Sequence, residues 1–208
     1  MYNQGLGKLI TLEGPEGAGK STQARVLYLW LQEKGYDPLF TREPGGTDLG
    51  SRIRDILLEA GADIAAAAEI FLYGADRAQH VEKVIAPALR QGRIVLCDRY
   101  IDSTMAYQGY ARGLGIDFVE QVNNLAVGEF IPDLTLLYDI PVSQGMKRKG
   151  TRPLDRMELE ALEFHQAVRE GYLKIAEREK RVTVIDAGDD YKTVARKSIE
   201  AVSKLLKG

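Results

Sequence analysis

The segment at residues 14–21 constrains this chain more than any other part of its sequence. It reads G-P-E-G-A-G-K-S and matches G-x-x-x-x-G-K-[ST]. A short apolar run precedes it at residues 8–12, and apolar residues at helical spacing follow it at residues 21–34. A strand, a glycine-rich turn and a helix in this order form a loop whose backbone N–H groups bind phosphate oxygens. The sequence therefore predicts a nucleotide-binding loop.

Within this loop, the positive charge of Lys20 is expected to face phosphate, and the hydroxyl of Ser21 is expected to face Mg²⁺. Asp98 ends another apolar run, at residues 94–97, and is expected to face Mg²⁺ with Ser21, directly or through water. An aspartate standing alone there could instead cap a helix or occupy a turn. The chain lacks the Asn-Lys-x-Asp segment of guanine-specific GTPases, so ATP is the expected triphosphate. The expected ATP contacts are Gly14, Pro15, Glu16, Gly17, Ala18, Gly19, Lys20, Ser21 and Thr22.

Short apolar runs alternate with helical patterns along the rest of the chain. Further strands are predicted at residues 39–41, 93–97, 134–138 and 182–185, and a helical region at 64–91 is expected to bend or divide near Pro87. Buried strands that alternate with helices are typical of a doubly wound α/β fold, a five-stranded parallel sheet with helices on both faces. Hydrophobic residues make up 45% of the 208, and no Ser- or Pro-rich linker is present, so a single domain over residues 1–208 is predicted.

Composition limits the partners of the chain. The 28 basic and 30 acidic residues give a net charge of −2, which argues against nucleic acid or a membrane as partner. The single cysteine, Cys97, excludes an internal disulfide, fits the reducing cytoplasm and is expected to be a small core residue. No apolar stretch approaches the length of a membrane span. His80 and His165 are expected at the surface or partly packed.

Two arginines follow predicted strands and distinguish a kinase from a hydrolase. Arg42 follows the second strand and Arg99 follows the third, so both should lie at the carboxyl edge of the sheet, where open α/β folds bind ligands. Either arginine alone could form an ordinary surface salt bridge. Together, next to the loop, they predict a second pocket that holds an anionic acceptor. A regulatory ATPase, which needs no such pocket, remains an alternative of another class.

Five segments together resemble the bacterial thymidylate kinases, in the family's order and over essentially the whole chain. They read GPEGAGKST at residues 14–22, TREPGGT at 41–47, DRY at 98–100, ST with AYQG at 103–109, and PDLT at 132–135. The resemblance implies a nucleoside monophosphate kinase-like P-loop fold and transfer of the ATP γ-phosphate to dTMP on the pathway to dTTP. Another pyrimidine monophosphate kinase is the closest alternative.

The resemblance also implies roles for single residues. The residue matching Phe71 would stack on thymine, although in its sequence context it could simply be core, and those matching Arg77 and Gln108 would read the pyrimidine edge. Gln108 carries both a donor and an acceptor, so strong exclusion of dCMP but only a modest preference over dUMP is expected. Tyr107 would fill the space of a 2′-hydroxyl and Glu16 would face the 3′-hydroxyl. The substrate-binding set is Glu16, Arg42, Glu43, Arg54, Phe71, Arg77, Arg99, Thr104, Tyr107 and Gln108; of these, Arg54 could also lie on a solvated helix face.

A basic segment at about residues 147–156 is predicted to be a mobile lid. It holds five cations, Lys147, Arg148, Lys149, Arg152 and Arg156, broken by Gly150 and Pro153, and could otherwise be a solvated charge run. In thymidylate kinases with Gly-Ala-Gly in the loop and no arginine there, the catalytic arginine comes from the lid. The expected catalytic residues are therefore Lys20, Arg99, Arg152 and, as second choice, Arg148, with Asp155, Arg156 and Glu158 fixing the closed lid. The family is commonly homodimeric, and the helix at residues 64–72 could form the interface or pack on the sheet.

Overall fold

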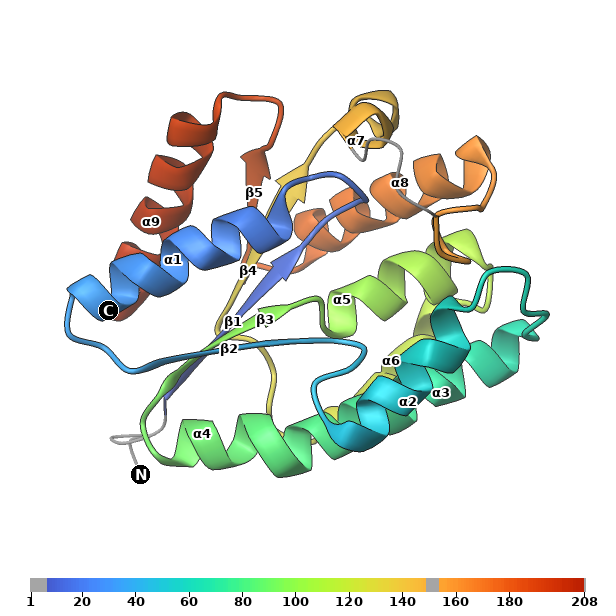
Figure 1. Cartoon of the computed structure of the whole chain (residues 1–208), viewed down its shortest axis with the longest axis horizontal. Coiled ribbons are helices and arrows are strands. Elements are labelled where there is room, and N and C mark those ends of the chain that lie inside the picture. Colours follow the sequence, from blue (N-terminus) through green and yellow to red (C-terminus); the bar gives the residue numbers. More distant parts are fainter. Residues whose placement is uncertain (1–6, 149–153, 208) are drawn as a thin grey trace.

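The computed structural model describes residues 7–148 and 154–207, and five parallel strands form the sheet at the centre of this part of the chain (Figure 1). The strand order is β2-β3-β1-β4-β5. The strands are β1 (Lys8–Glu13), β2 (Pro38–Arg42), β3 (Ile94–Asp98), β4 (Leu134–Asp139) and β5 (Val182–Asp186). Each strand predicted from sequence is confirmed to within two residues at either end.

The register of the sheet places the polar strand ends together. Asp98 at the end of β3 is the partner of Leu12 in β1 on one side and of Arg42 in β2 on the other. Because all strands are parallel, the loops after β1, β2 and β3 leave the sheet at the same edge. The predicted phosphate-binding loop and the two arginine segments therefore meet there.

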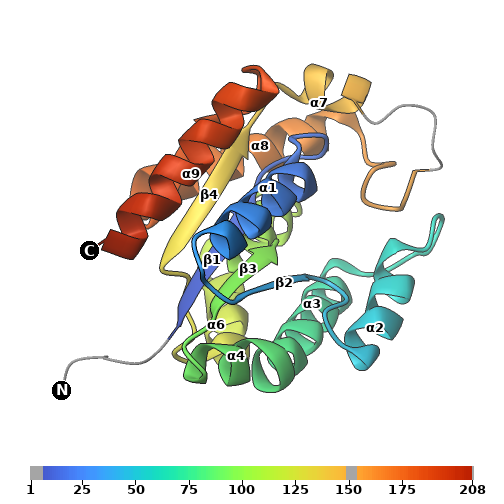
Figure 2. The same cartoon turned by 60° about the vertical axis from the view of Figure 1, so that its left-hand side comes forward.

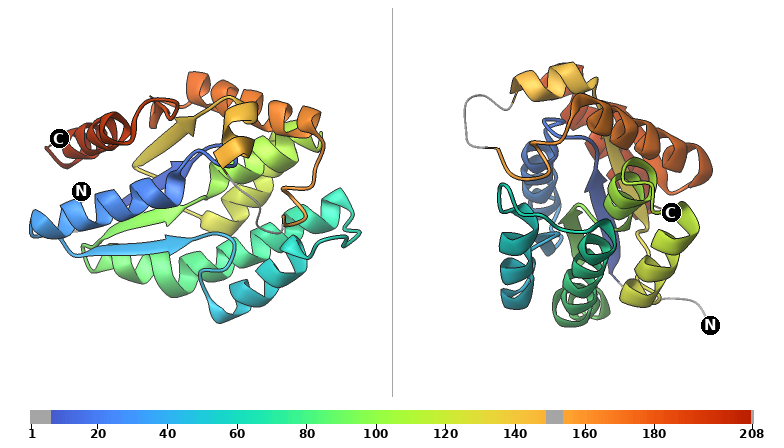
Figure 3. Two further views of the ribbon diagram at one scale, coloured as in Figure 1. Left: turned by 45° about the horizontal axis from the view of Figure 1, so that its top comes forward. Right: turned by 90° about the vertical axis from the view of Figure 1, so that its right-hand side faces the viewer.

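Helices cover both faces of the sheet (Figures 2 and 3). On one face lie α1 (Lys20–Glu33) and α9 (Tyr191–Lys207). On the other side of the sheet lie α3 (Ala66–His80), α6 (Ile116–Val127), α8 (Leu162–Arg178) and the short helix α4 (Ala86–Arg90). The remaining elements are α2 (Asp48–Leu58), α5 (Ile101–Thr104), α7 (Val142–Arg148) and the π-helical turns η1 (Val81–Ile85) and η2 (Met105–Ala111).

Alternate residues of the strands supply the two cores. In β1, Ile10 and Leu12 pack with α1 and α9, whereas Leu9 packs with η1 and α4 on the opposite face. Burial on both faces explains why the strands read as apolar runs rather than as alternating patterns. Cys97 is fully buried in the second core, as expected.

Two helical expectations need refinement. The region at residues 64–91 does divide before Pro87, through the π-helical turn η1. A proline ring clashes with the carbonyl four residues earlier, and a widened turn relieves that clash. The spacing of Leu162, Val168, Tyr172 and Ile175 predicts one inner helix face, and the last three are buried, whereas Leu162, the first residue of α8, is 45% exposed. Within the described residues, no helix is both long and apolar enough to cross a membrane.

Candidate active site

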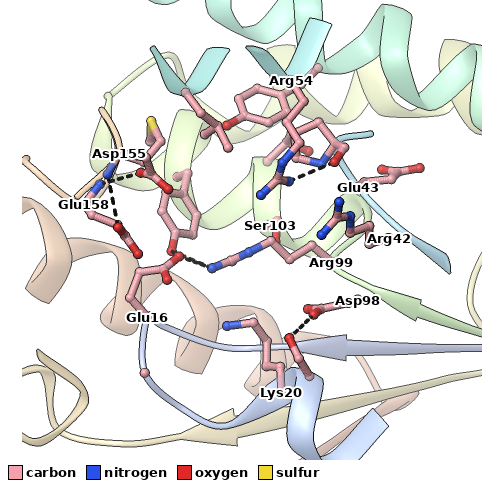
Figure 4. Close-up of a pocket in the computed structure, with 18 of the residues that line it drawn as sticks. Glu16, Lys20, Arg42, Glu43, Arg54, Asp98, Arg99, Ser103, Asp155 and Glu158 are labelled. Atoms are coloured by element: carbon pink, nitrogen blue, oxygen red, sulfur yellow. Dashed lines mark hydrogen bonds and ion pairs between the residues drawn. The ribbon is translucent and has the colours of Figure 1, made fainter. Parts of the chain in front are cut away.

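A cavity of about 410 Å³ opens at the carboxyl edge of the sheet (Figure 4). Its walls come from the loop after β1, the segments after β2 and β3, helices α2 and α3, η2 and the chain just before α8. Most of the residues singled out in the sequence line it. They are Glu16, Gly17, Gly19, Lys20, Ser21, Thr22, Arg42, Glu43, Arg54, Arg77, Asp98, Arg99, Thr104, Tyr107 and Gln108.

The loop at residues 14–21 has the conformation that its glycines permit. Gly14, Gly17 and Gly19 have φ angles of 139°, 74° and 84°, values that residues with a side chain rarely adopt. Lys20 curls over this loop, and its Nζ donates to the carbonyl oxygens of Gly14 at 2.9 Å and Pro15 at 3.0 Å. Burial, and after it the charge of Arg99, lowers the pKa of Lys20 to about 8. An incoming phosphate would offset both effects.

Ser21 and Asp98 form the part of the site that suits Mg²⁺. The Ser21 hydroxyl donates to Oδ2 of Asp98 at 2.7 Å, the dashed line drawn at Asp98 in Figure 4. Among residues 7–148 and 154–207, no group of three or more His, Cys, Asp or Glu side chains could hold a metal ion. One hydroxyl and one carboxylate fit Mg²⁺, which usually completes its shell with water and substrate phosphate oxygens.

Arg99 lies at the centre of the cavity and is held from several sides. Its Nη2 forms an ion pair with Glu16, and its Nη1 donates to Ser103 at 3.3 Å and to Tyr172 at 3.2 Å. The backbone of Arg99 has φ 70°, a left-handed conformation in which non-glycine residues are uncommon. Unusual backbone geometry of this kind is concentrated at functional sites.

Behind Arg99 lies a buried carboxylate that the sequence analysis did not single out. Glu13 accepts from Tyr100 N at 2.7 Å, from the Ser103 hydroxyl at 2.6 Å and from the Tyr172 hydroxyl at 2.9 Å. Burial, and after it the charge of Asp102, raises the pKa of Glu13 to about 7. Glu13 thus fixes the hydroxyl groups that in turn hold the Arg99 guanidinium.

Arg42 and Arg54 complete a cluster of positive charge with Arg99. Arg54 Nη1 donates to the carbonyl of Pro44 at 2.9 Å, and this guanidinium faces the cavity beside Arg42 (Figure 4). Burial first and the charge of Arg42 second lower the pKa of Arg54. Three guanidinium groups around one space repel one another until an anion enters, so this end of the cavity is suited to phosphate.

Arg77 and Glu43 form a buried network rather than an open contact surface. Arg77 is 1% exposed and donates to Glu43 at 2.7 Å, Asn123 at 2.6 Å, Thr104 at 3.0 Å and the carbonyl of Tyr100 at 3.0 Å. A guanidinium has five N–H donors, so four contacts leave one for a ligand. Glu43 is therefore positioned to orient Arg77.

The expectation for the two histidines is wrong. His80 is fully buried, with Nδ1 at 2.9 Å from Glu43 Oε1 and Nε2 at 2.6 Å from the hydroxyl of Thr41. His165 is only 3% exposed and packs edge to face on Phe164. His80 extends the Glu43 network from α3 to β2, a connection between distant segments that sequence spacing does not reveal.

The structure does not place Phe71 at the cavity. Phe71 is 57% exposed and packs edge to face on Phe118 of α6, with ring centroids 6.2 Å apart. Tyr73, two residues further along α3, lines the cavity instead. Residues two apart on a helix point in nearly opposite directions, whereas Tyr73 and Arg77, four apart, share a face. That spacing is the signal that could have identified Tyr73.

Gln108 is held at the cavity wall by a residue that the sequence analysis missed. Its Nε2 donates to Oε1 of Glu69 at 2.7 Å, and Glu69 is fully buried. Glu69 lies four residues before Tyr73 and eight before Arg77, on the same face of α3. Nearby, Tyr107 packs its ring against Arg99, with the guanidinium carbon 5.2 Å from the ring centroid.

The predicted lid is described in part. Arg152 lies outside the described residues, as do Lys149, Gly150 and Pro153. Arg148, at the end of α7, donates to the carbonyl of Ala187 at 2.9 Å and does not line the cavity. On the other side of the gap, Asp155 and Glu158 line the cavity. The Asp155 N–H donates to the Glu158 carboxylate at 3.1 Å, and the Glu158 N–H donates to the Asp155 carboxylate at 3.0 Å. Arg156 is 8% exposed and donates to the carbonyl of Leu57 at 2.8 Å.

A glycine-rich loop of the G-x-x-x-x-G-K-S type and a second, cationic pocket at one edge of a doubly wound parallel sheet are features of P-loop phosphotransferases of the nucleoside monophosphate kinase type. A family model described as thymidylate kinase matches residues 12–198. The chain belongs to the thymidylate kinase family, and it is an enzyme of that family.

Similar proteins cover nearly the whole chain. The thymidylate kinase of Thermoanaerobacter sp. (strain X514) is 46% identical over 201 residues, which span 96% of this chain and 99% of that protein. The thymidylate kinase of Desulfovibrio desulfuricans is 48% identical over 205 residues, 92% of this chain and 94% of that protein. A crystal structure of thymidylate kinase from Ehrlichia chaffeensis superposes with a TM-score of 0.78 at 34% identity and covers 94% of this chain and 98% of that one.

Proposed function

We propose that this chain transfers the γ-phosphoryl group of ATP to the 5′-phosphate of dTMP, which yields dTDP and ADP on the pathway to dTTP. The observation that carries this proposal is the pair of anion sites in one cavity: the loop with Lys20 on one side and the Arg42, Arg54 and Arg99 cluster on the other. A switch or motor ATPase has no use for the second site. Membership of the thymidylate kinase family supports dTMP as the acceptor.

The reaction needs positioning and charge stabilisation more than covalent chemistry. An acceptor phosphate is already ionised at neutral pH, so no general base is required, and transfer proceeds in line between the two bound phosphates. Lys20 neutralises charge on the triphosphate, and Arg99 lies where it can contact the acceptor phosphate. Mg²⁺, held through Ser21 and Asp98, supplies further neutralisation of the phosphate oxygens when bound.

The base is recognised on the α3 side of the cavity. Gln108 faces the N3–H edge of the pyrimidine with its amide, and Arg77 contributes its one remaining N–H. We assign the stacking platform to Tyr73, which lines the cavity, rather than to Phe71. Thr104, the last residue of α5, and Tyr107 of η2 contact the sugar and base. Glu16 faces the 3′-hydroxyl.

The segment at residues 147–156 acts as a lid within one kinase domain over residues 1–208. Closure excludes water from the transferring group and brings Arg152 over the ATP phosphates. The contact of Arg148 with the Ala187 carbonyl makes Arg152 the stronger candidate of the two. The enzyme acts in the cytoplasm as a homodimer, through the exposed side chains of α3 and α6 that include Phe71, Phe118 and Leu125.

The test is ADP formation from Mg·ATP with dTMP, dUMP, UMP, dCMP, AMP or no acceptor, each at equal concentration. We expect dTMP to be fastest, dUMP to follow within about 200-fold, dCMP to be slower by roughly 10⁴ or more, and the acceptor-free rate to be negligible. If another pyrimidine monophosphate reacts faster than dTMP, the chain is instead a kinase for that nucleotide. Equal ADP formation without acceptor would favour a regulatory ATPase and overturn the proposal.

A further inference from the structure

Glu69 lies at a point where three segments of the chain meet behind the cavity wall. It comes from the first turn of α3, and its carboxylate is fully buried. Oε1 accepts from Gln108 Nε2 at 2.7 Å, and Oε2 accepts from Arg156 Nη2 at 2.5 Å. Arg112 contributes two longer hydrogen bonds, of 3.4 Å each, one to each oxygen. No step of the proposed reaction uses Glu69.

Two guanidinium groups donate to the Glu69 carboxylate, Arg156 to Oε2 and Arg112 to both oxygens. Both oxygens of Glu69 therefore act as acceptors, so the group that faces them from Gln108 must be the NH₂ end of the amide. The NH₂ and the carbonyl of an amide are nearly identical in shape, and only the hydrogen-bond partners distinguish them. The charge on Glu69 therefore fixes which way the Gln108 amide points.

The opposite end of this amide is left for the substrate. Gln108 lines the cavity, and its Oε1 accepts no hydrogen bond from the described residues. A carbonyl oxygen at this position accepts from the N3–H of thymine or uracil, whereas the N3 of cytosine is itself an acceptor and is repelled. The second N–H of the amide can reach the base carbonyl beside N3.

We infer that Glu69 is a specificity-determining positioning residue, whose carboxylate orients the Gln108 amide so that the cavity accepts thymine and rejects cytosine. This inference rests on the proposed function, because it concerns the base of the proposed acceptor. It adds a residue that does not touch the substrate and acts only through Gln108.

The decisive variant is Glu69→Gln. Its carbonyl oxygen will stay with Arg156, the closest cation, so its new NH₂ will face Gln108. Gln108 must then turn its carbonyl toward residue 69 and its NH₂ toward the cavity, which is the arrangement that cytosine prefers. We expect the ratio of kcat/KM for dTMP to that for dCMP to fall at least tenfold. Both kcat/KM values are measured on the same preparation of each variant, so a smaller fraction of folded protein lowers both equally and does not change their ratio.

Two matched variants separate orientation from general damage to the cluster. Arg112→Gln removes a cation from Glu69 but leaves the bond to Gln108, so it should lower thermal stability and keep the ratio. Glu69→Asp keeps an acceptor-only group, so it should retain the exclusion of dCMP even where kcat/KM for dTMP drops. An unchanged ratio in Glu69→Gln, with dTMP still the best acceptor of the wild type, would overturn the role of Glu69 and leave the proposed function standing.

A measurement on the wild type without substrate tests the orientation independently of activity and of the stability of any variant. The side-chain NH₂ of Gln108, assigned by its absence in Gln108→Met, should show one proton shifted downfield and slow to exchange, because it is bonded to a buried carboxylate. Two equivalent, rapidly exchanging protons would overturn the inference. If the Gln108 amide shows this signature but the protein does not phosphorylate dTMP, the proposed function is refuted and the orientation of Gln108 by Glu69 is not.

Discussion

At the scale of single residues, the cavity is a place where positive charges are held close together and out of water. Lys20, Arg54 and Arg99 each face it, and the pKa values of Lys20 and Arg54 are lowered first by burial and then by a neighbouring arginine. The carboxylates of Glu16 and Asp98 partly offset this repulsion. Anionic ligands should therefore change the protonation of the site as well as occupy it.

Lys20 gives the clearest prediction of this kind. Its pKa of about 8 lies below the ordinary 10.5, so between these values the ligand-free protein holds Lys20 partly neutral, and bound phosphate favours the protonated form. Binding of Mg·ATP at pH 8.5 should therefore take up protons. Titration calorimetry in two buffers of different ionisation enthalpy measures the number. At pH 7, where Lys20 is about nine-tenths protonated, uptake should fall to roughly a tenth of a proton per ATP bound. Equal uptake at both pH values would contradict this assignment.

The two aromatic residues of α3 make a second, paired prediction. Stacking of a base on an aromatic ring contributes about 1–3 kcal/mol, so Tyr73→Leu should lower kcat/KM for dTMP by roughly 5- to 150-fold, mainly through KM. Phe71→Leu is the matched control, because it truncates a ring that packs on Phe118 outside the cavity. Steady-state kinetics with dTMP as the varied substrate compares them. A larger loss in Phe71→Leu than in Tyr73→Leu would restore the assignment made from sequence.

At the scale of elements, α7 packs directly on the phosphate-binding loop. A Cβ added at Gly145 of α7 would lie 2.3 Å from the carbonyl oxygen of Glu16, and one added at Gly17 would lie 2.0 Å from the carbonyl oxygen of Gly145. Both contacts involve backbone atoms, which cannot turn aside as a side chain can. The helix that leads into the predicted lid is therefore in close contact with the loop expected to hold the ATP phosphates.

Gly145→Ala should consequently impair ATP binding. Helix propensity alone would make this change favourable by about 1 kcal/mol, so any loss comes from the clash with the loop. We expect kcat/KM for ATP to fall at least tenfold while the KM for dTMP changes by less than about twofold. Ser143→Ala, an exposed position on the same helix, serves as the control and should leave both values unchanged. Wild-type kinetics in Gly145→Ala would mean that the loop and α7 can separate without cost.

The elements themselves were largely predictable, and the reason is local. Apolar runs and helical periodicity depend on residues close together in sequence, so every predicted strand agrees with the structure to within two residues. The contacts that were missed join distant segments: Glu69 with Gln108, 39 residues later, and His80 with Thr41, 39 residues earlier. The family resemblance assigns the stacking role to Phe71 because it is an aromatic residue in the matching helix. The spacing of Glu69, Tyr73 and Arg77, four residues apart on one face of α3, instead favours Tyr73.

At the scale of the whole molecule, the same helix that lines the cavity also presents apolar side chains outward. The stretch at residues 64–72 does not act as one face, since Ile70 is fully buried in the core while Phe71 is 57% exposed. On the adjacent α6, Leu125 is 90% exposed and Phe118 is 37% exposed. An exposed apolar surface spanning two packed helices is typical of a protein interface.

We expect this surface to form the homodimer, with a mass in solution near twice 23.1 kDa. In a twofold dimer each substitution occurs at two symmetric places, so Leu125→Glu removes two buried leucines. Each contributes about 1.5–3 kcal/mol, so the dissociation constant should rise by roughly 100-fold or more. Leu29→Glu, which places the same charge on an exposed leucine of α1, should leave the dimer intact. Analytical ultracentrifugation over a concentration series measures the dissociation constants of the wild type and of both variants. A wild type that is monomeric at every concentration would refute the dimer. Equal dissociation of the two variants would place the interface elsewhere.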